Sequence, residues 1–378
     1  MPLYETTFPT IPYQSVNAGV VPADVYGVAI NWYINRNPLA TRLPKLPVGS
    51  FSFLITNDNY RARSQALTSS YSTTATAIVV TDTSMYMPGD ILEVDAEQFK
   101  VTAIASSTNL TVTYAYGGTT NANHSSGAIA YLIGRAATGA DVDLQALSRN
   151  PAPVTQYVQV FQHAYQVGGG LNSATNYVSG FNSPLDRDRM MAIQHVMDDF
   201  ETSAYYGAGQ ALGASEKYQQ MKGLRALIST NKTTSPTNAA AYKPSDLTRD
   251  TLQKCFDNGG NPSLLLVSTD FLTGLAIWGV TAQRLNAGAT AFGTPIDLFM
   301  VPFLGGVPFV PSPMLRPGTA ICLSTAEALL RMKRPLFEVN RGPRGDAVEG
   351  DFIMEGAVEL LNESHHAWVS GITAFAAA

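Results

Sequence analysis

The stretch SPLDRDRMMAIQHVMDDFETSAYY, residues 183–206, decides the fold because it is a long amphipathic helix in a chain that otherwise reads as extended or irregular. Apolar side chains recur in it at steps of three and four residues, the spacing that places them on one helical face. This predicted buried stripe consists of Met190, Ile193, Met197, Phe200 and Ala204. The charged residues expected on the opposite, solvated side are Arg187, Arg189, Asp198, Asp199 and Glu201.

The ends of this helix are marked by residues with known terminal preferences. Ser183 can cap the free N–H groups, Pro184 suits the first helical position, and Asp186 places a negative charge in the first turn. Gly207 allows the helix to stop. At 1.5 Å per residue the predicted rod is about 35 Å long, so we expect it to be the spine that supports the other elements.

The composition favours assembly. The chain has 378 residues, which is enough for two or three domains and a sizeable core. Only 14% of the residues are charged, although 45% are hydrophobic; ordinary soluble proteins have about 25% charged residues. Charged residues are depleted where subunits cover one another, although fibrous and secreted proteins can share this low charge.

Nucleic-acid clamps and membrane segments are not indicated. The net charge is −5, and no basic run is long enough to hold nucleic acid. The start of the chain lacks the pattern of a signal peptide, and no run of about 18 apolar residues occurs. We expect a soluble protein made in the cytosol, without membrane contact. One basic cluster is the single candidate for nucleic-acid binding, but a solvated loop or a set of inter-subunit ion pairs is favoured over that alternative: Arg331, Lys333, Arg334, Arg341 and Arg344.

Residues 1–50 predict an extended arm. Prolines stand at positions 2, 9, 12, 22, 38, 44 and 47, and this density forbids a long helix. Such a segment cannot bury enough of itself to be stable alone, so we expect it to lie on other parts of the structure or on a neighbour. A strand is predicted at 51–56, and Asn57-Asp58-Asn59 after it is a turn or loop signal.

Residues 73–135 predict a small all-β module inserted in the larger chain. Short β-type runs alternate there with turn signals such as Pro88-Gly89-Asp90 and Gly117-Gly118. Five strands in about sixty residues are typical of a small sandwich or barrel. The predicted strands are 77–80, 91–94, 99–102, 110–113 and 129–132.

The remaining chain predicts a mixed α and β architecture. A β-rich run at 155–166 ends at Gly168-Gly169-Gly170, and helices are expected at 248–258 and 271–278. Further strands are predicted at 264–268, 297–301, 307–310, 320–323, 351–362 and 368–372.

No catalytic, cofactor or metal site is predicted. Gly168-Gly169-Gly170 follows a strand as a phosphate loop would, but no lysine follows and no helix is expected directly behind it. Asp198 and Asp199 could suggest the acid pair of a glycosidase, yet neighbours on a helix diverge by about 100°. We therefore interpret these residues, with Glu201, as a solvated or inter-subunit face.

The histidines and cysteines are given structural interpretations. His365 and His366, near Glu363, would point to opposite faces of a strand, so a turn is favoured over a metal site. The isolated His163 and His195 are expected to be packed or hydrogen-bonded. Two cysteines without metal-ligand spacing are expected to be buried thiols: Cys255 and Cys322.

The order of these parts resembles the major capsid proteins of tailed bacteriophages. The resemblance covers the chain from about residue 30 and rests on the order and texture of its segments, since no single motif is diagnostic. An arm, a loop region with a β insert, a β run, a glycine break and a long helix follow one another as in that family. The quoted segments are YVQVF at 157–161, NGGNP at 258–262, LLLVS at 264–268 and GDFIME at 350–355.

The resemblance implies an α+β, Hong Kong 97-like capsid fold. Carried over by segment, it assigns an N-terminal arm, an extended loop, a peripheral domain around the spine helix, an axial domain and an inserted all-β domain. The arm would be residues 1–50, and the extended loop 51–72 with 136–154. The peripheral domain would be 155–224 with 326–378, including the spine helix 183–206. The axial domain would be 225–325, and the inserted all-β domain 73–135. The β insert would either project from the shell or clamp neighbouring capsomers.

The function implied is that of a major capsid protein, not an enzyme, which self-assembles into hexamers and pentamers of an icosahedral shell. Its partners would be further copies, packaged double-stranded DNA held by non-specific contact, and portal, scaffolding or decoration proteins. It would reside in the virion after assembly in the bacterial host cytoplasm. The alternatives are a phage tail or adhesin protein, a carbohydrate-active enzyme with a β accessory domain, and an encapsulin-like compartment.

Overall fold

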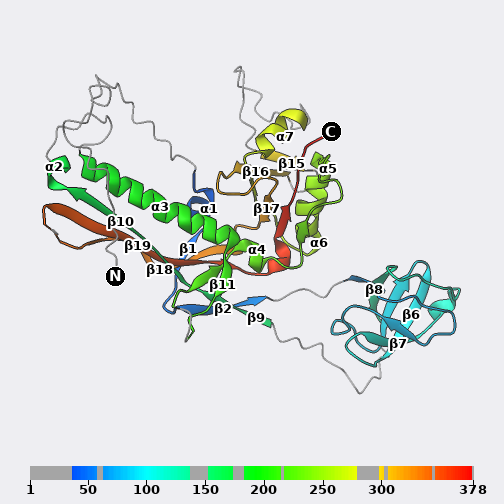
Figure 1. The fold of residues 1–378 in the computed structure, drawn as a ribbon. Coiled ribbons are helices and arrows are strands. Elements are labelled where there is room, and N and C mark those ends of the chain that lie inside the picture. Colours follow the sequence, from blue (N-terminus) through cyan, green and yellow to red (C-terminus); the bar gives the residue numbers. More distant parts are fainter. Residues whose placement is uncertain are drawn as a thin grey trace, which may run out of the picture. The chain divides into compact units, whose positions relative to one another are not determined.

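The computed structural model of the protein describes residues 36–57, 63–136, 152–172, 183–213, 217–278, 298–301, 305–342 and 345–376. The chain forms two compact units (Figure 1). One unit comprises Met1–Ile55 and Pro153–Ala378, and the other Thr56–Ala152. The mixed α and β composition predicted from the sequence is confirmed.

The long helix α3 (Pro184–Tyr206) begins and ends where the sequence predicts. The Ser183 hydroxyl accepts a hydrogen bond from the Asp186 N–H at 3.2 Å, and Pro184 occupies the first turn. Gly207 ends the helix for a different reason than expected. Its φ of −52° is open to any residue, but a Cβ there would lie 2.3 Å from the Met221 carbonyl oxygen. The strand that contains Met221 approaches the end of α3 so closely that only glycine fits at position 207.

The buried face of α3 differs from the predicted stripe. Ala192, Val196, Phe200 and Ala204 are buried at steps of four, whereas Met190 is 53% exposed. Ile193 and Met197 are only partly buried against the core. Residues four apart lie on one side of a helix, and this row joins the main apolar core of the larger unit. The contact direction, which the sequence does not state, selected the face.

A four-stranded sheet carries α3, which lies along it in Figure 1. The order is β1-β18-β19-β10, with β1 parallel and the others antiparallel. Phe161 of β10 meets Phe200 edge-on, with ring centroids 5.5 Å apart. The sequence analysis missed β18, whose arginines, lysine and proline obscure its pattern. The bounds are β1 Lys45–Pro47, β10 Gln159–Gly168, β18 Ala328–Asn340 and β19 Ala347–Leu360.

A six-stranded mixed sheet, ordered β13-β20-β17-β14-β16-β15, forms the second core of the same unit. Its central strand β14 is buried at all four residues. The strand β20 was assigned by sequence to the peripheral domain, yet it lies between β13 and β17. The bounds are β13 Lys232–Thr234, β14 Leu264–Val267, β15 Leu298–Val301, β16 Gly305–Pro311, β17 Ala320–Leu323 and β20 Ala367–Ser370.

Short elements surround these two sheets. The predicted helix 248–258 is part of a longer helical run that starts at α5 and contains a π-helical segment at Thr248–Gln253. The predicted helix 271–278 is α7. The bounds are α2 Gly169–Asn172, α4 Leu224–Leu227, α5 Pro244–Leu247, α6 Lys254–Asp257, α7 Phe271–Trp278, β11 Ala208–Gln210, β12 Gln220–Lys222 and the 3-10 turn Glu363–His365.

Residues 36–50, which the sequence analysis placed in the extended arm, pack on the larger unit. Pro38–Arg42 form the short helix α1, in which Leu39 and Ala40 are buried, and β1 pairs with β18. Residues 1–35 lie outside the described residues, as do Asp58 and Asn59 of the predicted turn and much of the predicted extended loop. The strands β2 (Ser52–Asn57) and β9 (Ala152–Tyr157) pair with each other.

The second unit holds a six-stranded antiparallel sheet, ordered β3-β8-β5-β6-β7-β4, around its own apolar core. All five strands predicted between residues 73 and 135 are present, and β3 is an additional strand too short for its pattern to show. The bounds are β3 Ser64–Ala66, β4 Ala77–Val79, β5 Asp90–Val94, β6 Glu97–Ile104, β7 Asn109–Thr113, β8 Ile129–Arg135 and a 3-10 turn at Tyr116–Gly118.

The face assigned to α3 can be tested by paired truncations. Phe200→Ala should lower the free energy of unfolding by about 3–5 kcal/mol, because Phe200 is 1% exposed and leaves a cavity against Phe161. The control Met190→Ala, at an exposed position, should change it by about 0.5 kcal/mol or less. Urea titration measures both. Equal losses would contradict the assignment.

Candidate functional site

The acidic residues at the C-terminal half of α3 have three separate partners. Asp198 pairs with Arg36 at 3.0 Å, and Asp199 contacts the His163 Nε2 at 2.7 Å. Glu201 points into the core and is 0% exposed. Asp198 and Asp199 therefore bind different partners. The prediction that Glu201 lies on a solvated or inter-subunit face is wrong, because Glu201 is buried against α1 of the same subunit.

Glu201 binds the start of α1. Its two carboxylate oxygens accept the backbone N–H groups of Leu39 and Ala40 at 2.8 and 2.9 Å. Asn37, the N-cap residue of α1, makes no side-chain capping bond of its own. A side chain of another helix therefore supplies the acceptors that free helical N–H groups require.

Tyr205, one turn further along α3, completes this buried group. Its hydroxyl lies 2.6 Å from Glu201 Oε1 and 3.2 Å from the Ser312 Oγ. Burial raises the pKa of Glu201 to about 6, although its hydrogen bonds to Tyr205, Leu39 and Ala40 act in the opposite direction. Burial also raises the pKa of Tyr205 well above its ordinary value. Sequence reasoning missed this group, whose only signal is that 201 and 205 flank the row 192, 196, 200 and 204.

The basic cluster predicted at 331–344 is a ladder of ion pairs within the subunit. Cations of β18, and Arg341 directly after it, lie against carboxylates of β19 that are nearly buried, with side-chain exposures of 3–5%. Hydrogen bonding to Arg334 is the main cause that lowers the pKa of Glu355. The expected solvated loop or inter-subunit pairing is therefore wrong for these residues. The pairs are Arg331–Glu359, Lys333–Glu355, Arg334–Glu355 and Arg341–Asp351, and Arg344 lies outside the described residues.

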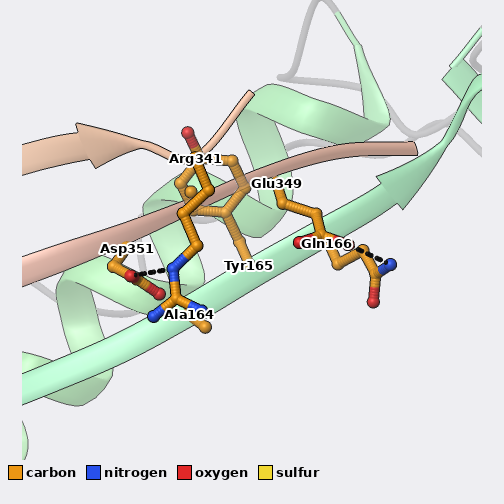
Figure 2. A pocket seen from close by; sticks show the side chains of 7 residues that line it. Ala164, Tyr165, Gln166, Arg341, Glu349 and Asp351 are labelled. Carbon is orange, nitrogen blue, oxygen red and sulfur yellow. Dashed lines mark hydrogen bonds and ion pairs between the residues drawn. The ribbon is translucent and has the colours of Figure 1, made fainter. Parts of the chain in front are cut away.

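One end of the ladder borders an open hollow of about 410 Å³ (Figure 2). Arg341 reaches Asp351 of the neighbouring strand, and Gln166 of β10 donates to Glu349 at 2.7 Å. A Cβ on Gly350 would lie 2.3 Å from the Tyr165 hydroxyl, so the glycine gives that ring its place. These polar groups already bind one another.

The remaining predicted site residues also have structural partners. His365 contacts Glu327 at 2.8 Å, while Glu363 accepts the backbone N–H groups of Ser229 and Thr230. The His366 Nδ1 accepts the Ser324 N–H, and its Nε2 faces the Leu361 carbonyl. Among the described residues no group of three or more His, Cys, Asp or Glu side chains could hold a metal ion.

The cysteines and the two isolated histidines lie as the sequence predicts, but the glycine break does not. The predicted buried thiols, Cys255 and Cys322, are confirmed. The rings of His163 and His195 pack 5.4 Å apart, as expected for structural histidines. The expectation that no helix follows the glycine break is wrong, because α2 begins at Gly169.

His366 should make stability depend on pH. Burial lowers its pKa from 6.5 to about 4, so its stabilising contribution is complete above pH 6.5 and is lost as the pH falls through 4. Between pH 7 and pH 4 it should remove about 3 kcal/mol from the free energy of unfolding. Urea titration of His366→Gln should lack this component, whereas the control His163→Gln, at a more exposed histidine, should keep it. An unchanged loss in His366→Gln would contradict the assignment.

Several solved structures resemble this chain at low sequence identity. The holo-SrpI encapsulin complex of Synechococcus elongatus PCC 7942 is 12% identical, with 90% of this chain and 89% of that chain covered and a TM-score of 0.45. The structure of the Phage G gp27 major capsid proteins and gp26 decoration proteins is 10% identical, with 93% of this chain and 94% of that chain covered and a TM-score of 0.46. The structure from Microbacterium phage Oxtober96 is 9% identical, with 95% of this chain and 99% of that chain covered and a TM-score of 0.48.

The family of this chain is shown by its match to a protein-family model. No curated protein sequence matches the chain. In the part of the chain that the structure describes, no helix is long and apolar enough to cross a membrane. The model of the family described as SU10 major capsid protein matches residues 4–373. Because this match spans nearly the whole chain, the protein belongs to the SU10 major capsid protein family.

Proposed function

We propose that this major capsid protein is the repeating subunit of an icosahedral shell, arranged in hexamers and pentamers around the double-stranded DNA of a tailed bacteriophage. The family match over residues 4–373 carries the proposal. The long helix on a sheet, the separate mixed sheet and the all-β unit agree with the Hong Kong 97-like fold that the resemblance implies. The role is structural, with no enzymatic activity.

The surface of the larger unit supports self-association. Several large apolar side chains are exposed on this unit, and only 14% of the residues in the chain are charged. Apolar area that a monomer leaves in water becomes stabilising once neighbouring subunits cover it. The residues include Phe51, Leu54, Val160, Met190 and Leu212.

Contact with DNA is proposed to be non-specific. The cations of the basic cluster are engaged by carboxylates of β19, and the net charge of the chain is −5. Sequence-independent DNA binding depends on cationic groups near phosphates. Because the cations of this cluster are already paired, we propose that the contact with packaged DNA is weak as well as non-specific. The partners proposed beside further copies are portal, scaffolding and decoration proteins. Assembly in the host cytoplasm and residence in the virion follow from this role.

We carry over the roles of the segments as part of the proposal. Residues 1–50 act as the arm, 51–72 with 136–154 as the extended loop, 155–224 with 326–378 as the peripheral domain and 225–325 as the axial domain. The inserted all-β domain, proposed as 73–135, projects from the shell or clamps neighbouring capsomers. Contacts of β20 with β13 and β17 join the peripheral and axial segments within one sheet.

The direct test is negative-stain electron microscopy of the purified protein together with its sedimentation profile. Closed shells, or rings of five and six subunits, are expected. A uniform monomer or a slender trimer under all conditions of assembly would contradict the proposal and favour a tail protein.

The arm can be tested by removing residues 1–35. The shortened chain retains α1 and β1, whose side chains and backbone pack on the larger unit, so it should unfold cooperatively with nearly unchanged stability. It should nevertheless fail to close into shells, because the arm gains its stabilisation from neighbours. Electron microscopy and urea titration provide the two readouts. Shells of normal size would refute the role of the arm.

The all-β unit can be tested by replacing residues 63–136 with a short Gly/Ser linker. Its apolar core is separate from the two cores of the larger unit, so the remaining chain should stay soluble and folded. Circular dichroism and the midpoint of urea unfolding measure this. Insoluble or unfolded protein would show that the larger unit depends on the insert.

A further inference from the structure

The structure contains a buried carboxyl group whose surroundings suit two protonation states. Glu201 is 0% exposed, and its described contacts are Leu39 N–H, Ala40 N–H and the Tyr205 hydroxyl, none of them cationic. A buried charge without a cation is costly. Hydrogen bonds from three donors offset part of that cost.

The hydroxyl chain beyond Glu201 can reverse its direction. Tyr205 lies within hydrogen-bonding distance of both Glu201 and Ser312, but its one proton can serve only one of them at a time. With Glu201 charged, Ser312 donates to Tyr205, which donates to the carboxylate. With Glu201 neutral, its hydroxyl donates to Tyr205, which donates to Ser312. Both states leave the two amides of α1 with an acceptor oxygen.

We propose that Glu201, Tyr205 and Ser312 form a proton switch that controls how tightly the segment 36–43 is held on α3. Neutral Glu201 holds the segment more tightly than charged Glu201, because undocking exposes the carboxyl to water, where its charged form is favoured. The segment connects the proposed arm to the larger unit, so the switch acts at the root of the arm.

The sign of the effect follows from linkage. The pKa of Glu201 in the docked state is about 6, against its ordinary value of 4.5, so docking takes up a proton and is strengthened as the pH falls from 6 toward 4.5. These two values predict that the opening equilibrium of the segment increases about eightfold from pH 5 to pH 8.

Neighbouring charges do not reverse this sign. Asp198, one turn earlier on α3, further raises the pKa of Glu201 and is itself paired with Arg36 at 3.0 Å. The ring centroids of Tyr205 and Tyr206 are 6.2 Å apart, and the guanidinium of Arg316 stacks on the Tyr206 ring. The Arg36–Asp198 pair is part of the docked contact itself, because Arg36 lies in the segment 36–43.

Hydrogen–deuterium exchange of the Leu39 and Ala40 amides tests the switch in the full chain. After correction for intrinsic exchange rates, the wild-type opening equilibrium should rise about eightfold from pH 5 to pH 8. Glu201→Gln imitates the neutral acid and should remove the rise. The matched control Asp199→Asn lies outside the network and should keep it. A pH-independent wild type, or the full rise in Glu201→Gln, would overturn the proposal.

A second variant keeps the test decisive if Glu201→Gln does not fold. Tyr205→Phe removes the hydrogen bond that favours the carboxylate, so the midpoint of the pH dependence should move to higher pH. An unchanged midpoint would overturn the proposal. The exchange is measured on unassembled subunits separated by sedimentation, so the result does not depend on whether the chain forms shells.

Discussion

The packing of one face of α3 on β10 and β19 is the constraint on which the rest of the larger unit depends. Phe200 lies at the centre of this contact, against Phe161, and the row through Ala192 and Val196 follows it. Residues four apart lie on one side of a helix, and this side joins the main apolar core. That geometry also carries Glu201 beneath α1, so the direction of one contact determines how residues 36–43 are held.

Several carboxylates of the larger unit are buried and have partners within the same subunit. The carboxylates of β19 are covered by cations of β18, and Glu201 is covered by α1. A buried carboxylate is tolerated where hydrogen-bond donors surround it. Only 14% of the residues in the chain are charged, a composition that implies a surface short of charge. A surface of this kind suits contact with further copies, since desolvating free charges would oppose association.

The all-β unit illustrates how a chain can accept an insertion. Its core is built from its own strands, and the larger unit completes both of its cores without them. The chain leaves near β2 and returns near β9, and these strands pair with each other. Pairing the two ends of an insertion reduces the entropy that the surrounding fold would otherwise lose. The insert can therefore differ in sequence character from the rest of the chain.

Local signals in the sequence were enough for the limits of α3 and for most strands, because caps, turns and alternation act within a few residues. They were not enough for β18, the exposure of Met190, the pairing of the basic cluster or the place of β20. Glu201 is the clearest case: its hydrogen-bond partner Leu39 is 162 positions away. Burial and pairing of this kind are decided by which distant segments meet, and only the tertiary structure brings them together.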